Sequence, residues 1–97
     1  MAEIPETKAV AVHITGRVQG VGYRAWVERS ARRLGVDGWV QNDLNGSVSA
    51  LLDGPEAAVD EMLQAMESGP PAARVTQVSA CPAAGLPGRG FVIRHPV

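Results

Sequence analysis

The sequence predicts an α+β fold, in which one sheet is covered on one face by two helices. Three observations support this prediction. The spacing of apolar residues changes from alternation to a helical period of about 3.6 residues and back, twice along the chain. Glycine and proline interrupt the pattern near each change. The 97 residues suffice for one domain with one core.

The first strand and the first helix have clear patterns. Residues 8–15 alternate, with Val10, Val12 and Ile14 on one face, which is typical of a half-buried strand. After a glycine-containing segment, apolar residues recur at helical spacing over residues 23–34. Gly35 follows directly, where a helix C-cap is expected.

The later elements follow the same logic, and Met62 and Met66 are expected to fill the core from the second helix. In order, we expect strand 36–42, a hairpin turn 43–46, strand 47–52, a helix opened by 53–55 and stopped at 69–71, strand 75–80, loop 82–90 and a short closing strand 91–94. This is the ferredoxin-like βαββαβ sandwich, an antiparallel sheet with two helices on one face plus a short C-terminal strand. Residues 1–7 are expected to be a flexible N-terminal segment and 8–97 the domain.

Composition excludes several classes of function. The formal net charge of −1 argues against binding nucleic acid through its phosphates. No apolar run approaches the ~20 residues of a membrane span, and the start lacks a signal-peptide pattern, so we expect a cytoplasmic protein. Cys81 has no second cysteine, and His13 and His95 are far apart in sequence. We therefore expect no disulfide, no metal site and no cofactor.

The segment Gly16-Arg-Val-Gln-Gly-Val-Gly-Tyr-Arg24, between the first strand and the first helix, predicts an anion site. Glycine-rich turns can direct successive N–H groups at one ligand, and the helix N-terminus adds unpaired N–H groups. Arg24 in the first helical turn opposes the helix dipole, and a bound anion would resolve that conflict. The alternative is a plain surface loop with an incidental arginine. The segment lacks the P-loop pattern, so no nucleotide is implied.

Asn42 ends the second predicted strand, and in isolation it is typical of a residue that caps a turn. In a split βαβ unit, however, the first and second strands run parallel, so their C-terminal ends share one edge of the sheet. Arg24 and Asn42 can therefore meet at one site. An asparagine there can both donate to and accept from a water, which it would orient without titrating.

Two motifs in this chain resemble the signatures of the acylphosphatase family. Residues 16–24 are similar to Gly-x-Val-Gln-Gly-Val-x-(Phe/Tyr)-Arg, and Gly38-Trp-Val-Gln-Asn-Asp-Leu-Asn-Gly-Ser-Val48 is similar to Gly-(aromatic)-Val-x-Asn-x-x-x-Gly-x-Val. The resemblance covers residues 8–94, including the closing Gly-Phe-x-Ile. It implies hydrolysis of the carboxyl–phosphate anhydride of acyl phosphates without metal. It also implies a set of site residues, in which Arg24 and the N–H groups of Gln19, Gly20, Val21, Gly22 and Tyr23 bind the phosphoryl oxygens and Asn42 orients the attacking water.

The partners expected on this interpretation are an acyl phosphate and inorganic phosphate or another anion in the loop, with no nucleic acid, no membrane and a monomeric chain. The alternative class is a non-catalytic phosphate- or RNA-binding ferredoxin-like module, since Arg89-Gly-Phe-Val92 faintly resembles an RNA-binding motif. A related domain in hydrogenase maturation factors binds carbamoyl phosphate, but within long chains that carry zinc-finger segments.

Overall fold

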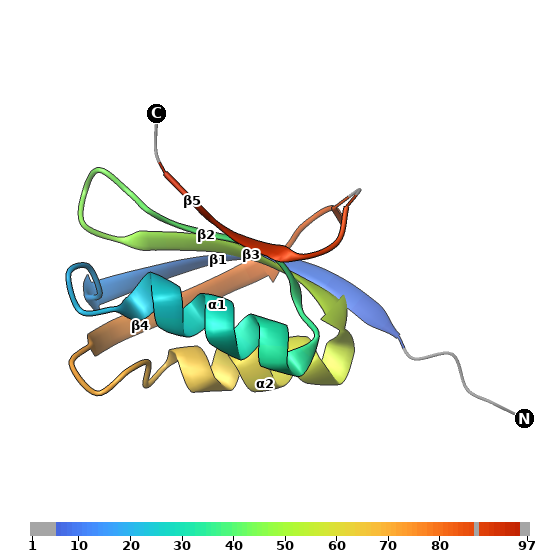
Figure 1. Ribbon diagram of the computed structural model, residues 1–97, viewed down its shortest axis with the longest axis horizontal. Coiled ribbons are helices and arrows are strands. Elements are labelled where there is room, and N and C mark those ends of the chain that lie inside the picture. Colours follow the sequence, from blue (N-terminus) through green and yellow to red (C-terminus); the bar gives the residue numbers. More distant parts are fainter. Residues whose placement is uncertain (1–5, 87, 96–97) are drawn as a thin grey trace, which may run out of the picture.

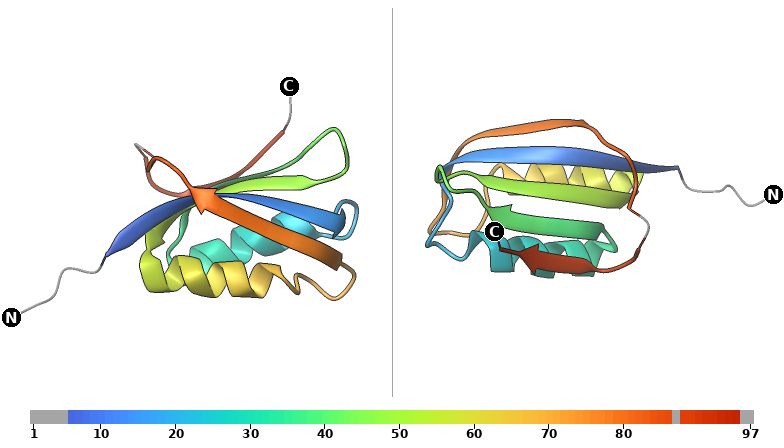
Figure 2. Two further views of the ribbon diagram at one scale, coloured as in Figure 1. Left: turned by 180° about the vertical axis from the view of Figure 1, so that it is seen from behind. Right: turned by 90° about the horizontal axis from the view of Figure 1, so that it is seen from above.

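The computed structural model describes residues 6–86 and 88–95, and within them it has two layers, a sheet and a pair of helices (Figure 1). The elements are β1 (Thr7–Arg17), α1 (Tyr23–Leu34), β2 (Asp37–Asn42), β3 (Val48–Pro55), α2 (Glu56–Met66), β4 (Arg74–Pro82) and β5 (Phe91–Arg94). Both helices lie on the same face of the sheet (Figures 1 and 2). The ferredoxin-like α+β prediction is therefore confirmed. Of the expected flexible segment, residues 1–5 lie outside the described residues, and Thr7 already belongs to β1.

The sheet has five strands in the order β4-β1-β3-β2-β5. β3 pairs antiparallel with both β1 and β2, so β1 and β2 run parallel on either side of it. The strands β4, β1, β3 and β2 form the expected antiparallel sheet, and the short C-terminal strand β5, for which the sequence indicated no direction, pairs parallel with β2. The chain leaves β4 at one edge and re-enters at the other (Figure 2). β4 runs antiparallel to β1, and β1 and β2 have the same direction. A strand that follows β4 and runs in the opposite direction is therefore parallel to β2.

The core lies between the sheet and the helices. Val10, Val12 and Ile14 of β1 point into it, as their alternation predicts, and His13 between them is exposed. Met62 and Met66 of α2 are both 0% exposed, which confirms that they fill the core. The core cluster comprises Val10, Val12, Ile14, Val18, Tyr23, Val27, Ala31, Val36, Val40, Val48, Ala50, Leu52, Val59, Met62, Met66 and Phe91.

Most predicted boundaries hold, and α1 has the bounds that its apolar spacing indicates. One boundary is wrong: residues 53–55 do not open the second helix but extend β3, where they pair with residues 7–9 of β1. Pairing along a neighbouring strand satisfies more backbone groups than a helical turn that begins at a proline, so the strand continues up to the N-cap Pro55. Within the described residues, no helix is both long and apolar enough to span a membrane.

Candidate active site

The loop between β1 and α1 carries two exposed glycines at the end of the sheet where β1 and β2 finish. Gly20 and Gly22 have φ angles of 74° and 80°, in the left-handed region that favours glycine. A Cβ built on either glycine would meet nothing within 4 Å, so the space in front of the loop is free. Gly22 is also the N-cap of α1, which has no side-chain cap and no acidic residue in its first turn. The positive end of α1 therefore lacks the usual partners of a helix N-terminus.

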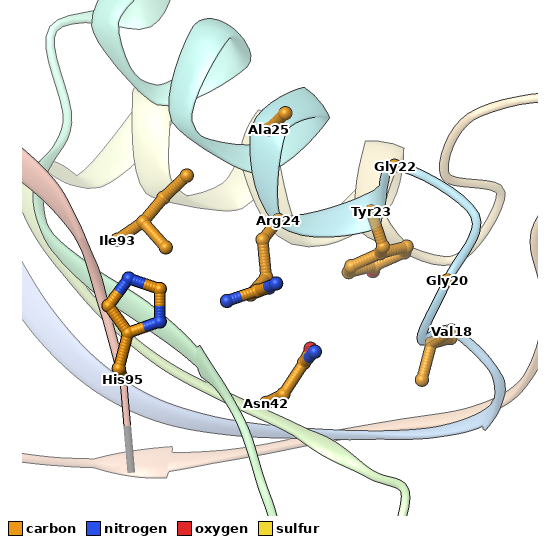
Figure 3. A pocket seen from close by; sticks show the side chains of 9 residues that line it. All are labelled: Val18, Gly20, Gly22, Tyr23, Arg24, Ala25, Asn42, Ile93 and His95. Atoms are coloured by element: carbon orange, nitrogen blue, oxygen red, sulfur yellow. The ribbon is translucent and has the colours of Figure 1, made fainter.

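Arg24 lies in that first turn and points into a pocket of about 380 Å³ (Figure 3). Among the described residues, no carboxylate forms an ion pair with Arg24. The described lining of the pocket contains no aspartate or glutamate either. A guanidinium beside an uncapped helix N-terminus concentrates positive charge, and an anion in the pocket would neutralise both.

Asn42, the last residue of β2, lines the same pocket from the sheet (Figure 3). Its Oδ1 atom is buried and has no hydrogen-bond partner among the described residues. The turn that follows is closed by other groups, since Asp43 N donates to Ser47 O at 2.8 Å and Ser47 N to Asn45 Oδ1 at 3.1 Å. The side chain of Asn42 is therefore not used in capping the turn. A buried amide oxygen without a partner requires an explanation, and a ligand or a bound water is one.

The structure brings Arg24 and Asn42 together, as the parallel course of β1 and β2 predicts. The pocket is lined by Val18, Gly20, Gly22, Tyr23, Arg24, Ala25, Asn42, Ile93 and His95. Of the residues predicted to bind the phosphoryl group, Gly20, Gly22 and Tyr23 thus line this pocket. The hydroxyl of Tyr23 is not available to the pocket, because it donates a hydrogen bond to Met66 O at 2.8 Å. Burial raises the pKa of Tyr23 far above its usual value, so this phenol stays protonated.

Gln19 and Val21, the other two predicted contacts, are absent from the described lining of the pocket. Val21 packs against the core. The amide of Gln19 reaches the β2–β3 hairpin instead, where Nε2 donates to Asp43 O and to Ser47 O, both at 2.8 Å. Gln19 therefore ties the loop to the turn next to Asn42, and only the backbone N–H groups of Gln19 and Val21 remain candidates for contact with a ligand.

A polar cluster holds the same hairpin in shape. The carboxylate of Asp43 accepts hydrogen bonds from Ser47, Ser49 and Gln41, at 2.8, 2.6 and 3.3 Å. His13 Nε2 lies 2.9 Å from Ser47 Oγ and extends the cluster to β1. Burial alone would raise the pKa of Asp43, but the hydrogen bonds from Ser49, Ser47 and Gln41 outweigh it, so the pKa lies below its usual value. Because Asp43 bonds to serines and not to His13, this cluster is a brace and not a catalytic triad.

Ile93 and His95, which were not among the residues predicted from the sequence, form the wall opposite the glycine loop (Figure 3). The parallel pairing of β5 with β2 brings them there, and it depends on a long-range register. The alternation in 91–95 indicates that Ile93 and His95 share a face, but not which strand they flank. No group of three or more potential metal ligands occurs among the described residues.

Comparison with known proteins identifies the family. The acylphosphatase family model matches residues 10–93. The chain is 49% identical over 84 residues to an acylphosphatase of Rhodospirillum rubrum, which covers 87% of this chain and 92% of the relative. The crystal structure of acylphosphatase from Bacillus subtilis superposes with a TM-score of 0.85 at 34% identity, covering 92% of this chain and 99% of that one. An acylphosphatase from Coxiella burnetii gives a TM-score of 0.87 at 28% identity, over 91% and 93% of the two chains. With its fold, its two motifs and these relatives in agreement, the chain belongs to the acylphosphatase family.

Proposed function

We propose that this acylphosphatase holds the phosphoryl group of an acyl phosphate between Arg24 and the N–H groups of residues 19–23, and that Asn42 orients the water that attacks phosphorus. The observation that carries the proposal is the buried Oδ1 of Asn42, which has no partner among the described residues and belongs to a side chain that lines the pocket that Arg24 enters. A water bound to that oxygen would have one hydrogen bond fixed, and with it the direction of its lone pairs.

The chemistry needs positive charge more than it needs a strong base. In phosphoryl transfer the charge spreads over the three peripheral oxygens, and a fixed guanidinium with backbone N–H groups stabilises it. The leaving group is a carboxylate, which departs without being protonated. In this proposal the attacking water gives its proton to an oxygen of the substrate's own phosphoryl group. The balanced outcome is a carboxylate and inorganic phosphate.

The RNA-binding alternative depends on Phe91, the aromatic residue of the 89–92 motif. That side chain is 1% exposed and belongs to the core cluster, so it is not free to stack on a base. The phosphate-binding alternative without catalysis shares the pocket and differs from the proposal only in the role of Asn42. Activity measurements therefore discriminate between the two.

Hydrolysis of benzoyl phosphate, followed by absorbance in the presence of EDTA, tests the proposal. Arg24→Ala is expected to raise KM and lower kcat/KM by about 1,000-fold, and Asn42→Ala to lower mainly kcat. Arg33→Ala is the matched control, because Arg33 is an exposed cation on the same helix outside the pocket, and its activity should equal that of the wild type. Full activity of either site variant, or activity abolished by EDTA in the wild type, would refute the proposal.

Two expectations from the sequence remain predictions about the protein in solution. We propose that the chain acts as a monomer, which size-exclusion chromatography with light scattering measures directly. We also propose a cytoplasmic location, which fractionation of the source cells tests. A stable dimer, or recovery in the membrane or secreted fraction, would contradict these expectations respectively.

A further inference from the structure

His95 lies on the rim of the pocket, on the side opposite the glycine loop. Figure 3 shows its imidazole turned into the pocket toward Arg24, with Asn42 on the far side of the guanidinium. The other polar side chains of the described lining are Arg24, Asn42 and Tyr23, and none of them ordinarily changes charge near neutral pH. Histidine is the side chain that ordinarily does so.

The register of the sheet explains why His95 faces the pocket. Val40 of β2 pairs with Ile93 of β5, and both side chains lie on the helix side, Val40 buried and Ile93 packed against the core. Because side chains alternate, Asn42 and His95, two residues further along, extend toward the same side from neighbouring strands. The start of β5 is held in place, since Gly38 N donates to Gly90 O at 3.0 Å and Phe91 is buried.

Among residues 6–86 and 88–95, the charged groups around His95 provide no anion for a protonated imidazole. From α1, Arg24 faces it, and one turn further Glu28 is already paired with Arg32 at 3.3 Å. Arg94 turns to the opposite face of the sheet, where it stacks on Trp39 at 4.1 Å. On the hairpin, Asp43 is engaged by Ser47, Ser49 and Gln41. A positive imidazole in this position would be compensated by a bound anion and not by a described carboxylate.

We infer that His95 is a third substrate contact, which donates a hydrogen bond to an outward-facing oxygen of the acyl phosphate and binds it more tightly when the imidazole is protonated. The inference rests on the proposed function of the pocket. The neutral ring can donate one hydrogen bond, whereas the protonated ring adds a positive charge beside that of Arg24. Since His95 lies at an exposed rim, the gain is that of a solvent-screened ion pair, about two- to fivefold in affinity.

Steady-state hydrolysis of benzoyl phosphate by the wild type and by His95→Gln, between about pH 5 and about pH 8, tests the inference. Glutamine keeps a hydrogen-bond donor but cannot be protonated. The ratio of KM in the variant to KM in the wild type should be about two to five at the acidic end and approach one at the basic end. The protonation of the substrate itself cancels in this ratio. The kcat values should agree within about twofold throughout, and the inhibition constant of inorganic phosphate should change as KM does.

His13→Gln is the matched control, because it removes the other histidine, which lies outside the described lining of the pocket. Its KM ratio should stay flat with pH. A flat ratio for His95→Gln, or a loss confined to kcat, would overturn the inference. Failure of the proposed function is distinguishable, since it would show as an inactive wild type or as an active Arg24→Ala.

Discussion

Replacing Asn42 by alanine is expected to remove most of the activity and to leave the fold at least as stable as before. The amide oxygen is buried without a partner among the described residues, and mutational data put the cost of such a group at about 1–3 kcal/mol. Alanine removes that cost but also some packing, so we expect the free energy of unfolding to rise by about 0–1 kcal/mol. For a domain of this size, 1 kcal/mol corresponds to about 4–8 °C in Tm.

Asn42→Ala is expected to lower the rate of catalysis, although it does not lower stability. Without the amide, the attacking water loses its fixed direction, and a misplacement of this kind typically costs about 100-fold in rate, or about 3 kcal/mol in activation free energy. Urea unfolding followed by the fluorescence of Trp26 and Trp39, with an unchanged m-value, measures stability. Hydrolysis of benzoyl phosphate measures kcat.

Asn45→Ala is the matched control, because Asn45 is the asparagine that does serve the turn. Its Oδ1 lies 3.1 Å from Ser47 N and 2.7 Å from Ser47 Oγ. Losing these contacts should lower the free energy of unfolding by about 1 kcal/mol and leave kcat unchanged. If Asn42→Ala were instead destabilised by 1 kcal/mol or more, with activity falling only as the folded fraction falls, Asn42 would be a structural residue and the reasoning would be refuted.

Other residues around the site give three further predictions. Gln19→Leu removes two hydrogen bonds to the hairpin, so it should lower the free energy of unfolding by about 1–2 kcal/mol and raise KM. Urea unfolding and steady-state kinetics measure the two effects. An unchanged KM would show that these hydrogen bonds do not position the loop. Because the pKa of Asp43 is lower in the folded protein than its ordinary value of 3.8, the ionised carboxylate stabilises the fold at pH values above 3.8. This contribution is lost as the pH falls through the folded pKa. Asp43→Asn should therefore lose less stability than the wild type between about pH 5 and about pH 2, as urea unfolding at each pH would show. Tyr23→Phe leaves Met66 O without its donor and should lower Tm by about 4–8 °C with kcat nearly unchanged, as calorimetry and kinetics would show.

The sequence predicted local structure well where a single residue type or a short period decides it. Apolar spacing placed α1 between Tyr23 and Leu34, and the short closing strand expected at 91–94 is β5, both with the observed bounds. It was wrong at 53–55, because the proline signal for a helix start says nothing about a strand partner further away. There the pairing with residues 7–9 of β1 keeps the chain extended.

The features of the candidate site also differ in whether local sequence or long-range packing decides them. The spacing of Gly20, Gly22 and Arg24 is local and predicts an anion loop at a helix start without any tertiary information. The meeting of Arg24 with Asn42 needed one topological step, the parallel course of β1 and β2. The side-chain contacts of Gln19 span 24 and 28 residues, and no local period predicts them.

The amino-acid sequence by itself therefore determined the elements, their order and the family, and it carried the prediction of an anion loop, because periodicity, glycine placement and motif spacing act over a few residues. Only the tertiary structure decided that β5 lies parallel beside β2 and brings His95 to the pocket, and that the amide of Asn42 is buried without a partner. Strand register and burial depend on where distant segments pack, and the free energy that selects among such packings is shared over the whole core.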